Sequence, residues 1–91
     1  MRLLSALLLW LALAPAALAQ DTGRFVEHQA VPSTNVAPPH VVVWLPPGYD
    51  QGNRRYPVVY MNDGQNLFFP ERSSYKKDWA ADKSALRLIA A

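Results

Sequence analysis

The chain has 91 residues, which is enough for one small domain at most. Its apolar fraction of 51% is raised by residues 1–19, while the remainder has the composition of an ordinary globular protein. The net charge of +2 is too weak to indicate nucleic acid or an anionic membrane as a partner, and the absence of Cys excludes a disulfide scaffold, a thiolate metal site, a Cys nucleophile and a lipidated Cys.

Residues 1–19 have the organisation of a signal peptide. Arg2 supplies a short positive region, and residues 3–14 form an uncharged, mostly apolar run. Ala17 and Ala19 place small side chains where a signal peptidase requires them, which predicts cleavage between Ala19 and Gln20. The mature chain is then exported, to the periplasm or the medium. The alternative is an uncleaved membrane anchor, against which the Ala-rich end and the missing positive flank both argue.

Three apolar segments follow in chain order. Arg24–Val31 alternates roughly between apolar and polar residues and suits a half-exposed strand, and Pro32–Pro39 is a turn region. His40–Leu45 is β-branched and aromatic, as strands are, and Gln51–Arg55 is a polar loop. Pro57–Met61 is continuously apolar, which is typical of a strand covered on both faces of a sheet.

The last part of the chain has a helical pattern. Asp78 is the expected N-cap, with Asp82 in the first turn, and Trp79, Leu86 and Ile89 share one apolar stripe. No Gly, Asn or Pro ends this helix before the last residue. About three strands and one helix also make too small a hydrophobic core for a complete domain. We therefore expect the sequence to be the beginning of a longer α/β protein.

Two blocks of sequence carry a family resemblance. VWLPPGYD at residues 43–50 and RYPVVYMNDGQNLF at residues 55–68 resemble the opening of the putative-esterase group of α/β-hydrolases. That group includes enterochelin-esterase-like, feruloyl-esterase-like and mycolyltransferase-like proteins. The resemblance covers roughly residues 40–90. It implies an α/β fold, represented here by the N-terminal portion of a hydrolase sheet, with about three strands and then a helix.

The resemblance also implies a role for the loop at residues 62–65. In an α/β-hydrolase a Ser attacks the substrate carbonyl, and one backbone N–H that stabilises the resulting oxyanion comes from the loop after the third strand. By the resemblance, the N–H of Gln65 is that donor, and Gly64 lets the backbone turn without a Cβ in the way. The alternative interpretation is that Asp63-Gly64 is an ordinary tight turn, as most Asp-Gly pairs are.

Other residues near this loop have weaker functional interpretations. Asp63 would either cap the loop amides, which is the more common role, or bind a substrate hydroxyl. Trp79 is expected to be mainly core, with lining of a substrate pocket as the alternative. The nearby aromatic side chains have the same two interpretations; they are Phe68, Phe69 and Tyr75.

The catalytic triad is not found in these 91 residues. The α/β-hydrolase order along the chain is Ser, then Asp or Glu, then His, so His28 and His40 come too early to be the base. No Ser lies in a Gly-x-Ser-x-Gly motif; the serines are Ser5, Ser33, Ser73, Ser74 and Ser84. No metal-ligand spacing and no phosphate-binding loop occur either, so the sequence implies no metal and no cofactor.

The leading hypothesis is an exported serine esterase that transfers an acyl group to water, with the nucleophile outside residues 1–91. The expected partner is a small-molecule or carbohydrate-linked ester, with no nucleic acid, and with a membrane only during export. Two alternatives stay open: a secreted binding module with an esterase-like fold, and a truncated product without function.

Overall fold

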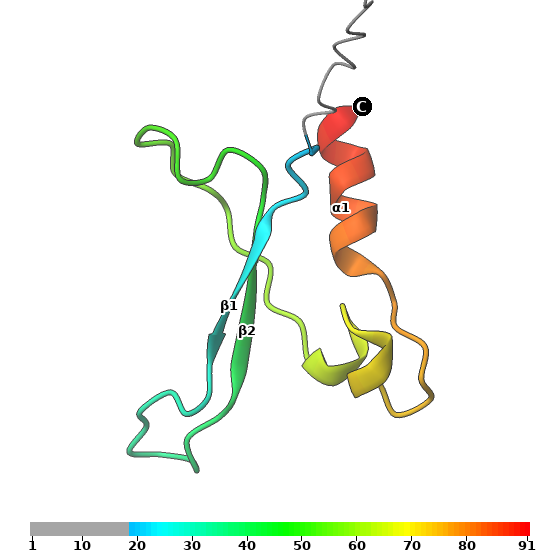
Figure 1. Cartoon of the computed structure of the whole chain (residues 1–91). Helices are drawn as coiled ribbons and strands as arrows, with labels where there is room; N and C mark the ends of the chain where they lie inside the picture. The colour runs from blue at the N-terminus through cyan, green and yellow to red at the C-terminus, as the bar shows by residue number, and fades with distance from the viewer. Residues whose placement is uncertain (1–18) are drawn as a thin grey trace, which may run out of the picture.

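The computed structural model describes residues 19–91, so the predicted signal peptide lies outside the described residues, apart from Ala19. The elements in chain order are strand β1 (Arg24–His28), strand β2 (Val41–Leu45), the 3₁₀-helix η1 (Gly64–Asn66), the 3₁₀-helix η2 (Pro70–Arg72) and helix α1 (Ala81–Ala90). Figure 1 shows the strands as one hairpin, with the 3₁₀-helices and α1 beside it.

The hairpin confirms two of the predicted strands. β1 and β2 pair antiparallel, with Phe25 opposite Trp44 and Val26 opposite Val43. β-Branched and aromatic side chains favour this pairing because they pack against their neighbours on a pleated surface. The predicted turn region between the strands is closed by a hydrogen bond from the Val31 N–H to the Pro39 carbonyl, at 2.9 Å.

The third predicted strand differs from the expectation. Pro57–Met61 belongs to no strand, and the sheet of the described residues has two strands. The segment runs extended between the hairpin and η1 (Figure 1) and is exposed rather than covered on both faces: Val59 is 81% exposed and Tyr60 91%. A strand exists only where a neighbouring backbone accepts and donates its hydrogen bonds, and no described residue does so here.

Helix α1 begins later than predicted. Its N-cap is Ala80, in the left-handed region at φ 51°, and not Asp78. The carboxylate of Asp78 instead accepts a hydrogen bond from the Ala80 N–H at 3.2 Å, a local bond of the kind that competes with helix formation. Asp82 lies in the first turn as predicted. Trp79 therefore precedes the helix, so it does not belong to the helical stripe.

The buried part of the described chain is small. Leu67 is 5% exposed and Ser73 4%, and both lie in the loop between the extended segment and α1. An aromatic cluster joins this loop to the hairpin: the ring centroid of Phe25 lies 5.0 Å from that of Phe68 and 4.8 Å from that of Phe69. Tilted contacts at such distances are the preferred geometry of aromatic pairs.

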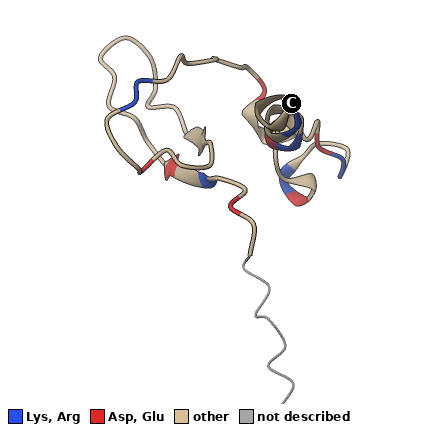
Figure 2. Ribbon diagram, turned by 90° about the horizontal axis from the view of Figure 1, so that it is seen from above, with Lys and Arg blue, Asp and Glu red and all other residues tan. Residues whose placement is uncertain are grey.

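Charged residues of both signs are interspersed along the hairpin, the loop and α1 (Figure 2). Three ion pairs form between opposite charges among the described residues, and each joins two different parts of the chain. Among residues 19–91, no helix is both long enough and apolar enough to span a bilayer.

Candidate functional site

The predicted oxyanion loop folds into η1. Asp63 precedes it with φ 56° and ψ 44°, which is the left-handed region, whereas Gly64 lies outside that region. A Cβ at Gly64 would meet no atom within 4 Å. The residue that makes the turn is thus Asp63, which is one of the few L-residue types that adopt this conformation at low cost. The Asp63 side chain makes no capping hydrogen bond, so the predicted capping role is not seen.

The backbone of η1 leaves two donors unused. Among residues 19–91, the N–H groups of Gly64 and Gln65 donate to no acceptor, as is usual in the first turn of a helix. The next two amides are occupied: the Asn66 N–H donates to the Asp63 carbonyl at 2.9 Å, and the Leu67 N–H to the Gly64 carbonyl at 3.2 Å. Gln65 is an exposed residue, and its N–H has no acceptor among the described residues.

Asn66 is a residue that the sequence did not single out. Its main-chain carbonyl accepts a hydrogen bond from the Trp79 N–H at 2.7 Å. Its side-chain Oδ1 accepts bonds from the Ser73 hydroxyl at 3.1 Å and from the Ser74 N–H at 3.2 Å. Asn66 therefore ties η1 to two later parts of the loop. The only sequence signal for this role is that an Asn lies in a turn cluster, and that signal does not predict which residues it hydrogen-bonds.

Ser73 has a structural position. Its side chain is buried, and its Oγ lies 2.7 Å from the Lys77 carbonyl oxygen as well as 3.1 Å from Asn66 Oδ1. A hydroxyl has one proton, which these two acceptors share. No His or carboxylate hydrogen-bonds to Ser73 among the described residues. This arrangement suits a loop-closing serine and provides no base to activate it.

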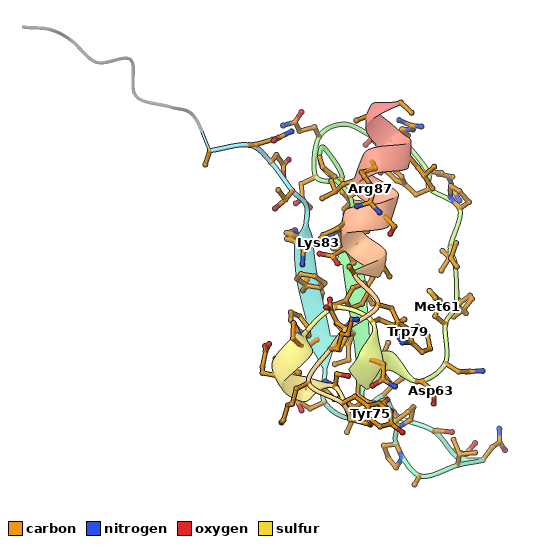
Figure 3. The ribbon with its side chains drawn as sticks, turned by 90° about the vertical axis from the view of Figure 1, so that its right-hand side faces the viewer. Met61, Asp63, Tyr75, Trp79, Lys83 and Arg87 are labelled. Atoms are coloured by element: carbon orange, nitrogen blue, oxygen red, sulfur yellow. The ribbon has the colours of Figure 1, made fainter. Side chains whose placement is uncertain are left out.

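Trp79 is not core in the described residues, because it is 56% exposed. In Figure 3 its side chain lies between α1 and the extended segment that carries Met61, which is 51% exposed. The Trp79 N–H donates to the Asn66 carbonyl, so the Trp79 backbone lies one residue away from the candidate donor Gln65. Of the other aromatics, Phe68 and Phe69 pack on the hairpin, and Tyr75 is 89% exposed.

Neither His hydrogen-bonds to a Ser among the described residues, as the base of a triad would. His28 ends β1 on its exposed side. His40 directly precedes β2, and its Nε2 lies 3.1 Å from Oε2 of Glu27, whose Oε1 accepts from Arg72 Nη1 at 2.8 Å. Hydrogen bonding from Arg72, and secondarily from His40, lowers the pKa of Glu27 below its usual range. Glu27 therefore stays ionised and joins the hairpin to η2.

A second carboxylate orders the turn after β2. Arg24 donates from Nε and Nη2 to the two carboxylate oxygens of Asp50, each at 2.8 Å. This two-pronged hydrogen bond lowers the pKa of Asp50 and raises that of Arg24. Gly48, the glycine of the Leu-Pro-Pro-Gly-Tyr sequence, adopts φ 78° in the same turn. No group of three or more potential metal ligands gathers anywhere in the part of the chain that the structure describes.

Comparison with known proteins gives one finding. The sequence model of the family described as Putative esterase matches residues 34–91, which is more than half of the chain. The match includes the turn after β2, the extended segment, η1 and α1. Neither a curated protein nor a solved structure matches the chain.

Proposed function

Because the chain belongs to the Putative esterase family, we propose that it is part of an exported serine esterase. Its substrate is a small-molecule or carbohydrate-linked carboxylic ester, as in the enterochelin-esterase-like and feruloyl-esterase-like subgroups that the sequence resembles. The reaction needs no cofactor. The nucleophilic Ser and its Asp/Glu and His partners lie outside residues 1–91, since these residues hold no Gly-x-Ser-x-Gly motif.

The chemistry proceeds through a Ser-bound acyl intermediate. The Ser oxygen attacks the ester carbonyl carbon while His takes its proton, and the carbonyl electrons move onto oxygen to form an oxyanion. Collapse of this tetrahedral intermediate expels the alcohol, which His protonates. Water then attacks the acyl-Ser by the same route and releases the acid. Each tetrahedral intermediate requires N–H donors that already point at the oxyanion.

The observation that carries this proposal is the unused N–H of Gln65. It lies at the start of η1, directly after the extended segment, and within the residues that match the esterase family. An N–H with no internal acceptor, on an exposed residue, can receive an oxyanion without first breaking a hydrogen bond. Residues 1–91 thus contribute one of the two oxyanion donors, and the amide after the nucleophile is the other.

The test uses the protein made from the complete open reading frame that contains these residues. Gln65→Ala keeps the backbone donor, so kcat for an activated ester such as p-nitrophenyl acetate should change little. Gln65→Pro deletes the donor and should lower kcat by roughly 10²–10³-fold, the usual loss for one oxyanion donor. An unchanged melting temperature must accompany the Pro variant, because proline can also distort the loop.

Two results would count against the proposal. A well-folded Gln65→Pro enzyme with normal kcat would return residues 63–65 to the role of an ordinary turn. A folded protein that binds esters without turnover, and that no fluorophosphonate labels on a Ser, would indicate a binding module instead of an enzyme.

A further inference from the structure

We infer that Asn66 is a positioning residue for the oxyanion donor: its side chain locks the peptide group that carries the Gln65 N–H. The inference rests on the proposed function of Gln65 and adds a residue to that site. It is drawn from the hydrogen bonds that converge on Asn66 and from the Leu67 N–H bond that orients the peptide between Gly64 and Gln65.

The direction of the Gln65 N–H is set by the carbonyl on the other side of the same peptide bond. In a planar trans peptide the C=O and N–H bonds point in opposite directions. The Gly64 carbonyl accepts the Leu67 N–H at 3.2 Å, so it points along η1 toward Leu67. The Gln65 N–H must then point the opposite way, out of the start of η1. Any movement of the Leu67 N–H would rotate this peptide and redirect the donor.

Asn66 and Leu67 are held in place from the far side of the loop. The Leu67 side chain is buried, and its carbonyl accepts the Ala81 N–H at 3.1 Å. The Asn66 carbonyl accepts the Trp79 N–H at 2.7 Å. These two main-chain bonds join η1 to the start of α1, and they require the intervening loop to fold back on itself.

The Asn66 side chain stabilises that folded loop. Its Oδ1 accepts from the Ser73 hydroxyl and the Ser74 N–H, which belong to the bend between η2 and α1. An amide oxygen has two acceptor sites, so Oδ1 can accept from both groups, with the Ser73 proton shared with the Lys77 carbonyl. With an apolar side chain in its place, the Ser74 N–H loses its acceptor, and the bend keeps its internal hydrogen bonds but loses its side-chain link to η1. A shift of η1 against the bend then reaches the Gln65 N–H through the Leu67 N–H, and a misplacement of about 1 Å can cost up to 10²-fold in rate.

The test compares Asn66→Leu, which is close in size but accepts no hydrogen bond, with Asn53→Leu as a matched control. The Asn53 side chain lies in the exposed loop after β2 and makes no hydrogen bond among the described residues. The measurement, on the protein from the complete open reading frame, is kcat and KM per active site, with active sites counted by fluorophosphonate labelling. Asn66→Leu should lower kcat about 10- to 100-fold with little change in KM. Asn53→Leu should match the wild type.

A second variant carries the test if Asn66→Leu does not fold. Ser73→Ala removes one of the two bonds to Oδ1, together with the bond to the Lys77 carbonyl, and should lower kcat in the same direction by less. If Asn66→Leu does fold, a double-mutant cycle of the two changes should be non-additive, because both remove the bond between Ser73 and Asn66.

The outcomes separate this inference from the proposed function. Loss of kcat in both Gln65→Pro and Asn66→Leu supports both. If kcat falls in Gln65→Pro but is the same in Asn66→Leu as in Asn53→Leu, the positioning role is overturned and the oxyanion assignment stands. Fewer active sites in Asn66→Leu, each with normal kcat, also overturns it, because that is the result of a purely structural role. Normal kcat in a folded Gln65→Pro enzyme overturns the oxyanion assignment itself.

Discussion

Arg72 donates from Nη1 to Oε1 of Glu27 at 2.8 Å, and so joins η2 to β1 across 45 residues of sequence. The Arg72 guanidinium also lies 4.3 Å from the ring centroid of Phe69, which packs on Phe25 of the same strand. One arginine therefore stabilises the contact between the hairpin and the loop that contains the candidate oxyanion donor, through both an ion pair and a cation–π contact.

The Glu27–Arg72 pair should make stability depend on pH in the acid range. The pKa of Glu27 is lowered in the folded state, chiefly by hydrogen bonding from Arg72 and secondarily from His40. A carboxyl whose folded pKa is depressed contributes stability above its unfolded pKa, and this is lost as pH falls through the folded pKa. Melting temperature should accordingly decrease as pH falls below 4.5, the ordinary value for this carboxyl.

The variant Glu27→Gln tests whether the Glu27–Arg72 ion pair is the source of this pH dependence. The variant should melt below the wild type at pH 7, and the difference should narrow as pH falls below 4.5. Asp50→Asn serves as the comparison, because the Asp50 pKa is also lowered but by Arg24, so this change removes an ion pair that does not involve Arg72. A difference between wild type and Glu27→Gln that stays constant from pH 7 to pH 3 would rule out the ion pair as its source.

The left-handed residue before η1 predicts opposite effects at two neighbouring positions. Asp63 has φ 56°, so Asp63→Val should destabilise the protein by about 1 kcal/mol or more, whereas Asp63→Gly should be neutral or stabilising. Gly64 is outside the left-handed region with open space at its Cβ position, so Gly64→Ala should be tolerated with kcat nearly unchanged. Thermal melts and kcat for the three variants provide the check. Greater damage from Gly64→Ala than from Asp63→Val would show that the turn is made at Gly64.

The isolated chain of residues 20–91 should have no esterase activity and little protection across Val58 to Met61. The reasons are the missing nucleophile and the exposure of this segment, whose amides donate no hydrogen bond within the described residues. Amide hydrogen exchange and an activated-ester assay measure both. Strong protection there, or turnover abolished by a single Ser→Ala change within the chain, would contradict this expectation.

The export prediction concerns residues outside the described part, apart from Ala19. Exported protein should begin at Gln20, as determined by N-terminal sequencing. Ala19→Arg places a large side chain where a small one is required and should block this cleavage, while Leu18→Gln, between the two small positions, should leave it unchanged. Intact Met1 in a membrane fraction of the wild type would instead identify an anchor.

The sequence alone determined the features that depend on neighbours along the chain. The β-branched run at Val41–Leu45 predicted β2, because side chains of that shape disfavour a helix wherever they occur. The two blocks around Gly48 and Gly64 predicted the esterase family, which the match over residues 34–91 confirms. The first inference needed only residue type, and the second rests on the resemblance of these two blocks to a known family.

Tertiary structure decided what depends on residues far apart in sequence. Pro57–Met61 has a strand-like composition, but a strand also requires a partner backbone, and composition does not supply one. The Ala81 N–H at the start of α1 donates to the Leu67 carbonyl, a contact that depends on how the distant loop folds. The Asn66–Ser73 bond likewise exists only because the loop folds back across seven residues, so no local pattern could predict it.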